Sequence, residues 1–97
     1  MTPEFHPAAD RELAAAVTVG EGIAAGLGVE FLTEAHRVIS LLCDFPRLGT
    51  PLDQQYRRFP LTRFPYAIVF RVAAERLQVV AIAHRRQRPN YWRGRTR

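Results

Sequence analysis

The residues best suited to chemistry lie together near the end of the chain, where His84 is followed by three arginines and a tyrosine. Histidine titrates near neutral pH and transfers protons readily. Arg85, Arg86 and Arg88 beside it are able to hold a phosphate and to stabilise negative charge in a phosphoryl-transfer transition state. Tyr91 adds a further acid or hydrogen-bond donor. Together these residue types resemble the catalytic set of a metal-independent ribonuclease.

A second interpretation of the same segment is structural. His84 then ends a strand and bonds to backbone, while the arginines only bind a partner. We favour this interpretation because no carboxylate lies close in sequence to orient the histidine as a proton acceptor. The ribonuclease hypothesis stays open, and its candidate catalytic residues are Arg58, Arg63, His84 and Tyr91.

Further arginines and aromatic residues extend this candidate surface. Tyr66 and Tyr91 are available to stack on bases or on guanidinium planes. The alternative is a solvated basic face whose aromatic residues belong to the core; Phe64 is assigned to the core, and Trp92 is expected to pin the tail against a sheet. The residues predicted to bind a target or an inhibitor protein are Arg57, Arg58, Arg63, Arg85, Arg86, Arg88, Tyr91, Arg93 and Arg95.

Charge is divided unevenly along the chain. Residues 46–97 contain 12 Arg and two acidic residues, a balance of +10, whereas residues 1–45 contain two Arg and seven acidic residues, a balance of −5. All 14 basic residues are Arg, whose planar fork binds phosphate and carboxylate groups. A GC-rich genome, which favours Arg codons, is one of two explanations of the missing Lys, but it does not explain the position of the arginines. The asymmetry predicts a polyanionic or acidic partner.

Several other kinds of site find no support in the sequence. The three histidines, at positions 6, 36 and 84, and Cys43 match no zinc-binding spacing. No Gly-rich phosphate loop follows a strand, and no nucleophile elbow is present, so we expect neither a metal nor a cofactor. Cys43 is the only cysteine and is expected to be buried. No secretory signal and no membrane-spanning apolar run are visible, which predicts a cytoplasmic location.

The length of 97 residues and the 47% hydrophobic content predict one globular domain. The hydrophobic pattern indicates two helices followed by strands. One face of the second helix is expected to carry Phe31, Ala35, Val38 and Leu42. The expected elements are a short extended segment at 4–6, helices at 8–25 and 29–43, a loop at 45–53, strands at 56–60, 67–72 and 77–84, and a basic tail at 85–97.

The last predicted strand is apolar on both faces, which is typical of a central strand covered on both sides. Strict alternation places Leu77, Val79, Ala81 and Ala83 on one face and Val80 and Ile82 on the other. The fold class that follows is α+β. A short N-terminal strand and an antiparallel helical hairpin (7–45) pack on a C-terminal antiparallel meander (55–84) in two layers.

Five segments in order resemble the ParE branch of the RelE/ParE toxin superfamily, often described as plasmid stabilisation proteins. They read FHPAADREL, GLGVEFLTEA, FPRLGTP, RRFPLTRFPYAIVFRV and VVAIAHRRQRPNYW and cover nearly the whole chain. The most specific pieces are residues 63–66 and 84–92. The resemblance implies a helical hairpin on an antiparallel sheet and the toxin half of a type II toxin–antitoxin pair, which a cognate acidic antitoxin neutralises.

Members of this superfamily differ in their targets. RelE-like members cut messenger RNA on the ribosome with Lys, Arg, Tyr and sometimes Glu or His, whereas ParE-like members lack that set and block DNA gyrase. This chain has no Lys, and its HRRQRPNYW segment is closer to the ParE side. The resemblance therefore implies a gyrase-binding toxin. A ribosome-dependent endoribonuclease and a degenerate, non-toxic binding partner are the alternatives, and either a homodimer or a toxin–antitoxin hetero-oligomer is compatible with them.

Overall fold

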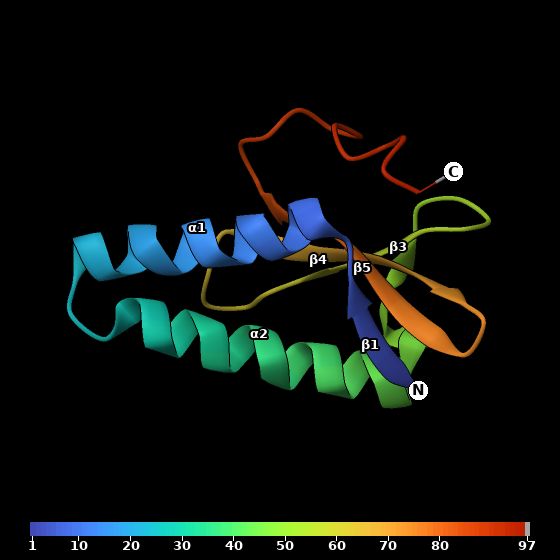
Figure 1. The fold of residues 1–97 in the computed structure, drawn as a ribbon, viewed down its shortest axis with the longest axis horizontal. Helices are drawn as coiled ribbons and strands as arrows, with labels where there is room; N and C mark the ends of the chain where they lie inside the picture. The colour runs from blue at the N-terminus through green and yellow to red at the C-terminus, as the bar shows by residue number, and fades with distance from the viewer. Residues whose placement is uncertain (97) are drawn as a thin grey trace.

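Two helices and a five-stranded sheet make up the fold in a computed structural model that describes residues 1–96 (Figure 1). Arg97, the last residue of the predicted basic tail, lies outside the described residues. The elements in chain order are β1 (Thr2–Phe5), α1 (Pro7–Ile23), α2 (Leu27–Asp44), a 3-10 turn (Pro46–Leu48), β2 (Thr50–Pro51), β3 (Arg57–Pro60), β4 (Tyr66–Ala73) and β5 (Arg76–His84). Within residues 1–96 no helix is both long and apolar enough to cross a membrane.

Capping residues and glycines determine where the helical hairpin begins and turns. Pro7 occupies the first turn of α1 and His6 caps it, with the Ala8 amide donating to His6 Nδ1 at 3.0 Å. The helix ends at Ile23, slightly earlier than predicted, and Gly26 then adopts a φ of 87° that favours glycine. A Cβ added at Gly28 would lie 2.3 Å from a backbone oxygen of α1. The two helices therefore depend on a residue without a side chain at this crossing.

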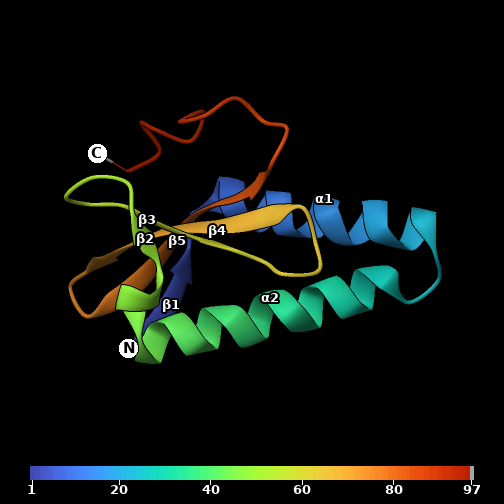
Figure 2. The same cartoon turned by 180° about the vertical axis from the view of Figure 1, so that it is seen from behind.

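The strand order of the sheet is β1-β5-β4-β3-β2. Strands β3, β4 and β5 form the predicted antiparallel meander, which confirms the α+β class. β1 pairs with β5 in parallel, so the complete sheet is mixed. β2 lies in the segment predicted as loop, and the prediction missed it because two residues ending in Pro51 carry no periodicity. Figure 2 shows α2 and the C-terminal segment on opposite sides of the sheet.

β5 is an interior strand between β1 and β4 and is covered on both faces, but its faces differ from the predicted alternation. Val69 pairs with Ala81 and Phe70 pairs with Val79, which leaves Val80 in a β-bulge. Leu77, Val79 and Ile82 consequently pack against the helices, while Val80, Ala81 and Ala83 face the other way. The predicted grouping of Val80 with Ile82, and of Val79 with Ala81, was wrong because one inserted residue reverses the alternation beyond it.

Each face of the sheet has its own core. The predicted helical face of α2 is confirmed, since Phe31, Ala35, Val38 and Leu42 are all buried against the sheet. On the opposite face Trp92, only 3% exposed, packs with Tyr56, Val69, Val80 and Ala81. Trp92 pins the chain after β5 to the sheet, as the sequence predicted. This segment, residues 85–96, is called the strap below.

Candidate functional site

A cleft of about 200 Å³ lies between the strap and the sheet face that is turned away from the helices. Arg58 of β3 enters it from one side, His84 lies at the end of β5, and Arg85, Arg88 and Tyr91 enter it from the strap. These five residues define the basic cleft. A second hollow adjoins it along the segment before β4, shares Arg58 and Arg85 with it, and adds Arg63. The fold therefore brings four arginines onto one continuous surface.

Not every arginine predicted to bind a partner lies at this surface. Arg57 precedes Arg58 on the same strand, so its side chain points to the opposite face of the sheet. It is half-buried there and donates to the Gly49 carbonyl at 2.8 Å. Arg86 is exposed but does not line the cleft, and Arg93 and Arg95 lie farther along the strap. Alternation along β3 thus separates two neighbours that the sequence grouped together.

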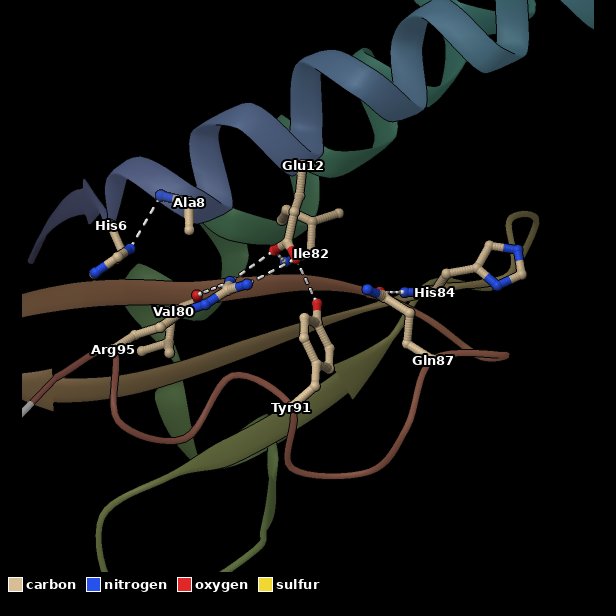
Figure 3. Close-up of polar contacts among 9 residues, drawn as sticks. All are labelled: His6, Ala8, Glu12, Val80, Ile82, His84, Gln87, Tyr91 and Arg95. Atoms are coloured by element: carbon tan, nitrogen blue, oxygen red, sulfur yellow. Dashed lines mark hydrogen bonds and ion pairs between the residues drawn. The ribbon is translucent and has the colours of Figure 1, made fainter.

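The strap is attached to α1 through Glu12, which no motif in the sequence marks as a functional residue (Figure 3). Its carboxylate accepts from the Tyr91 hydroxyl at 2.7 Å and from both terminal nitrogens of Arg95 at 2.9 and 3.0 Å. It also accepts from the Ile82 amide at 3.0 Å. Arg95 donates in addition to the Val80 carbonyl at 2.9 Å. Glu12 and Arg95 thereby satisfy backbone groups of β5 beyond the end of β1.

The environment of this cluster shifts the titration of its members. Burial alone would raise the pKa of Glu12, but hydrogen bonds from Arg95, Tyr91 and the Ile82 amide outweigh it and hold the pKa below its ordinary value. Burial, followed by the hydrogen bond to Glu12, raises the pKa of Tyr91 far above its usual range. The hydrogen bond to Glu12 also raises the pKa of Arg95. The cluster is therefore an ion pair with a neutral phenol at physiological pH.

A weak signal for Glu12 was present in the sequence. The buried residues of α1 are Ala9, Leu13, Ala16 and Gly20, and Glu12 lies on the flank of that apolar stripe rather than on the solvated side. An acid in such a position needs a buried partner. Tyr91 and Arg95 follow 79 and 83 residues later, so nothing local identified them.

Arg93 is also engaged within the fold. Its guanidinium group lies 4.6 Å from the ring centroid of Trp92 and 5.5 Å from that of Tyr56. It donates to the Asp53 carboxylate at 2.7 Å. Arg93 therefore stacks on the aromatic pair of the second core and ties the strap to the loop before β3.

The hydrogen bonds of His84 decide what its imidazole can do. The Arg86 amide donates to His84 Nδ1 at 3.0 Å, and the His84 amide donates to Gln87 Oε1 at 2.9 Å. Because Nδ1 is an acceptor, the neutral ring carries its proton on Nε2. Nε2 is then a donor and cannot remove a proton from a substrate. Within residues 1–96 no carboxylate hydrogen-bonds to this ring. The Tyr66 ring lies edge-on to it, with the two ring centroids 5.0 Å apart.

The comparison with known families agrees with the resemblance described above. The family described as "ParE toxin of type II toxin-antitoxin system, parDE" matches residues 4–89. The chain belongs to the ParE toxin family. A solved structure, "Chromosomal ParDE TA system from P. aeruginosa", superposes with a TM-score of 0.76 at 17% sequence identity and covers 87% of this chain and 95% of that one. The search of curated proteins finds no match.

Within this ParE fold the basic cleft combines hydrogen-bond donors with little capacity to accept a proton. Arg58, Arg85 and Arg88 form no ion pair with any of residues 1–96, whereas Arg63 lies 3.7 Å from Glu30. His84 offers an N–H group, and the Tyr91 hydroxyl already donates to Glu12. Such an arrangement is suited to holding an anionic group in place.

Proposed function

We propose that this chain is the growth-inhibiting component of a type II toxin–antitoxin pair, that it acts by binding DNA gyrase, and that a cognate acidic antitoxin neutralises it. One observation carries the non-enzymatic part of this proposal. The Nδ1 lone pair of His84 is taken by the Arg86 amide, so the histidine nearest the arginines has no nitrogen available as a general base.

The remaining candidate acid of the ribonuclease hypothesis is placed unfavourably as well. Tyr91 directs its hydroxyl to Glu12, and its raised pKa opposes ionisation. Arg58 and Arg63 line the surface but supply charge rather than proton transfer. A ribosome-dependent endoribonuclease would need a proton acceptor that the cleft does not offer. Family membership and the absence of Lys favour gyrase over the ribosome as the target.

The antitoxin proposal rests on charge. The surface formed by Arg58, Arg63, Arg85 and Arg88 belongs to the half of the chain with a balance of +10. A segment rich in Asp and Glu that covers this surface would associate quickly and selectively. Expressed without such a partner, the protein should arrest growth or be poorly soluble. Harmless, monodisperse protein at high expression would instead favour the degenerate, non-toxic alternative.

The test compares three variants at matched protein levels during induced expression. Changing Arg85, Arg86 and Arg88 together to Ala should weaken growth arrest, whereas His84→Gln should leave it nearly unchanged. The matched control removes the same charge elsewhere, by changing Arg11, Arg37 and Arg47, which lie on the two helices and the 3-10 turn, to Ala. Growth is measured beside a gyrase supercoiling assay and a translation assay.

The two mechanisms give opposite results in this experiment. A proton-transferring histidine contributes about 10²–10⁴-fold to a rate, so a ribonuclease would lose its activity in His84→Gln. If that folded variant fails to arrest growth, and the wild-type protein stops translation but spares gyrase, the gyrase proposal is wrong and the endoribonuclease takes its place.

A further inference from the structure

The basic cleft and the hollow beside it form a row of positive charge rather than a single point. Arg88 and Arg85 line the cleft, Arg58 and Arg85 line both spaces, and Arg63 lies in the hollow. None of the residues among 1–96 that line these two spaces is acidic. Arg58, Arg63, Arg85 and Arg88 are all exposed to solvent. The four positive charges therefore lie along one continuous surface, as binding of a polyanion requires.

The backbone that presents these arginines is held in place. The Arg85 amide donates to the Pro65 carbonyl at 2.9 Å, and the Gln87 amide donates to the His84 carbonyl at 3.0 Å. Farther along, buried Trp92 anchors the strap to the sheet. The turn after β5 is therefore fixed at both ends. Because its backbone is already ordered, binding of a ligand to its arginine side chains costs little backbone entropy.

We propose that this row of arginines contacts the phosphate backbone of DNA directly, so that the toxin holds DNA as well as protein at its target. The inference rests on the proposed function, since gyrase works on DNA. Arg presents a planar fork that pairs with phosphate oxygens through two hydrogen bonds. Phosphate contacts of this kind carry no sequence information. An acidic antitoxin covering the same arginines would exclude DNA from them.

The experiment measures binding of the full-length protein to a fluorescent 20-base-pair duplex by anisotropy over a range of salt concentrations. The test variant changes Arg58, Arg85 and Arg88 to Ala. The control variant changes Arg11, Arg37 and Arg47 to Ala and has the same net charge. Each phosphate contact steepens the dependence of log K on log salt by about 0.9. The test variant should therefore lose about 2.7 from this slope, whereas the control should keep the wild-type slope.

Several results would overturn the inference. Equal slopes in the two variants would mean that net charge alone attracts DNA. The same titration is repeated with labelled poly-glutamate in place of the duplex. If the test variant loses its affinity for poly-glutamate but keeps its affinity for DNA, the occupant of the cleft is an acidic polypeptide. Both variants must keep the wild-type melting temperature, which the exposure of all six side chains predicts.

The failures of the two proposals are distinguishable. If the test variant still inhibits gyrase and keeps the wild-type DNA affinity and salt slope, these arginines do not contact DNA and only the further inference fails. If the wild-type protein binds the duplex through these arginines but leaves supercoiling by gyrase unchanged, the proposed target is wrong while the DNA contact stands.

Discussion

Replacing Glu12 by Ala should destabilise the protein far more than the loss of a solvent-exposed helical glutamate would. The carboxylate of Glu12 accepts from Tyr91, from Arg95 and from the Ile82 amide, and the change leaves all three donors without their acceptor. The Glu12 and Arg95 side chains are only 19% and 18% exposed, so water replaces the lost acceptor poorly. The strap should consequently loosen from α1.

The size of the effect follows from that burial. Removing one partner of a fully buried ion pair costs about 3–5 kcal/mol. Because about a fifth of each side chain reaches solvent, we expect a loss of about 2–4 kcal/mol in the free energy of unfolding. In a domain of this size each kcal/mol lowers the melting temperature by roughly 4–8 °C. The melting temperature of Glu12→Ala should therefore fall by about 10–25 °C.

Thermal unfolding followed by circular dichroism measures this effect. The matched control is Glu30→Ala, which also removes a helical glutamate from an ion pair with Arg63. That pair is 3.7 Å apart with side chains 54% and 62% exposed, and pairs of this kind contribute little. A decrease for Glu12→Ala no larger than that for Glu30→Ala would refute the reasoning. A double-mutant cycle with Arg95→Ala should show strong coupling between the two residues.

The same cluster predicts a dependence of stability on pH. The pKa of Glu12 is lower in the folded protein than its ordinary value, so the stabilisation it provides is present above that ordinary value. The stabilisation is lost as the pH falls through the lowered pKa of the folded state. Glu12→Gln should flatten this acid limb of the stability curve. Asp53 and Glu21 also have lowered pKa values, so the stability of the variant should still fall to some extent at acid pH. If the melting temperature of Glu12→Gln decreases with falling pH as steeply as that of the wild-type protein, the role of Glu12 is contradicted.

Three further predictions concern the packing. Leu42→Ala and Ile82→Ala should each lower the free energy of unfolding, measured by chemical denaturation, by about 2–5 kcal/mol, because both side chains are fully buried. A change near zero would show that the buried faces of α2 and β5 are misassigned. Gly28→Ala should lower the melting temperature by forcing the helices apart, whereas Ala at exposed Gly22, where no atom lies within 4 Å, should not. Cys43 should react with iodoacetamide slowly when folded and quickly in urea, since burial raises the pKa of its thiol.

Local pattern was sufficient for much of the fold. The apolar spacing in α2 correctly identified its buried face, and the two-sided apolar character of β5 correctly placed that strand inside the sheet, although β4 and not β5 is the middle strand. The bulge at Val80 could not be predicted, because pairing with Val69 and Phe70 of the neighbouring strand creates it. β1 was predicted as a short strand, but its parallel pairing with β5 depends on where the hairpin returns the chain.

The candidate site was predictable only in part. The order of segments up to residue 92 carried the family resemblance, and the tail composition placed positive charge near His84. Which arginines act together was decided by the sheet, since alternation along β3 sends Arg58 to the cleft and Arg57 to the opposite face. The bond from the Arg86 amide to His84, which removes a proton acceptor, depends on the turn after β5.

The sequence by itself determined the α+β class, the buried helical face, the uneven charge and the toxin family, because each of these depends on residue types at short or fixed spacing. Only the tertiary structure decided that Glu12 holds Tyr91 and Arg95, and therefore which residues of the strap stay available for a partner. Those residues lie about 80 positions apart in the chain. Contacts at that separation form only when the sheet and the hairpin bring them together, so no local pattern records them.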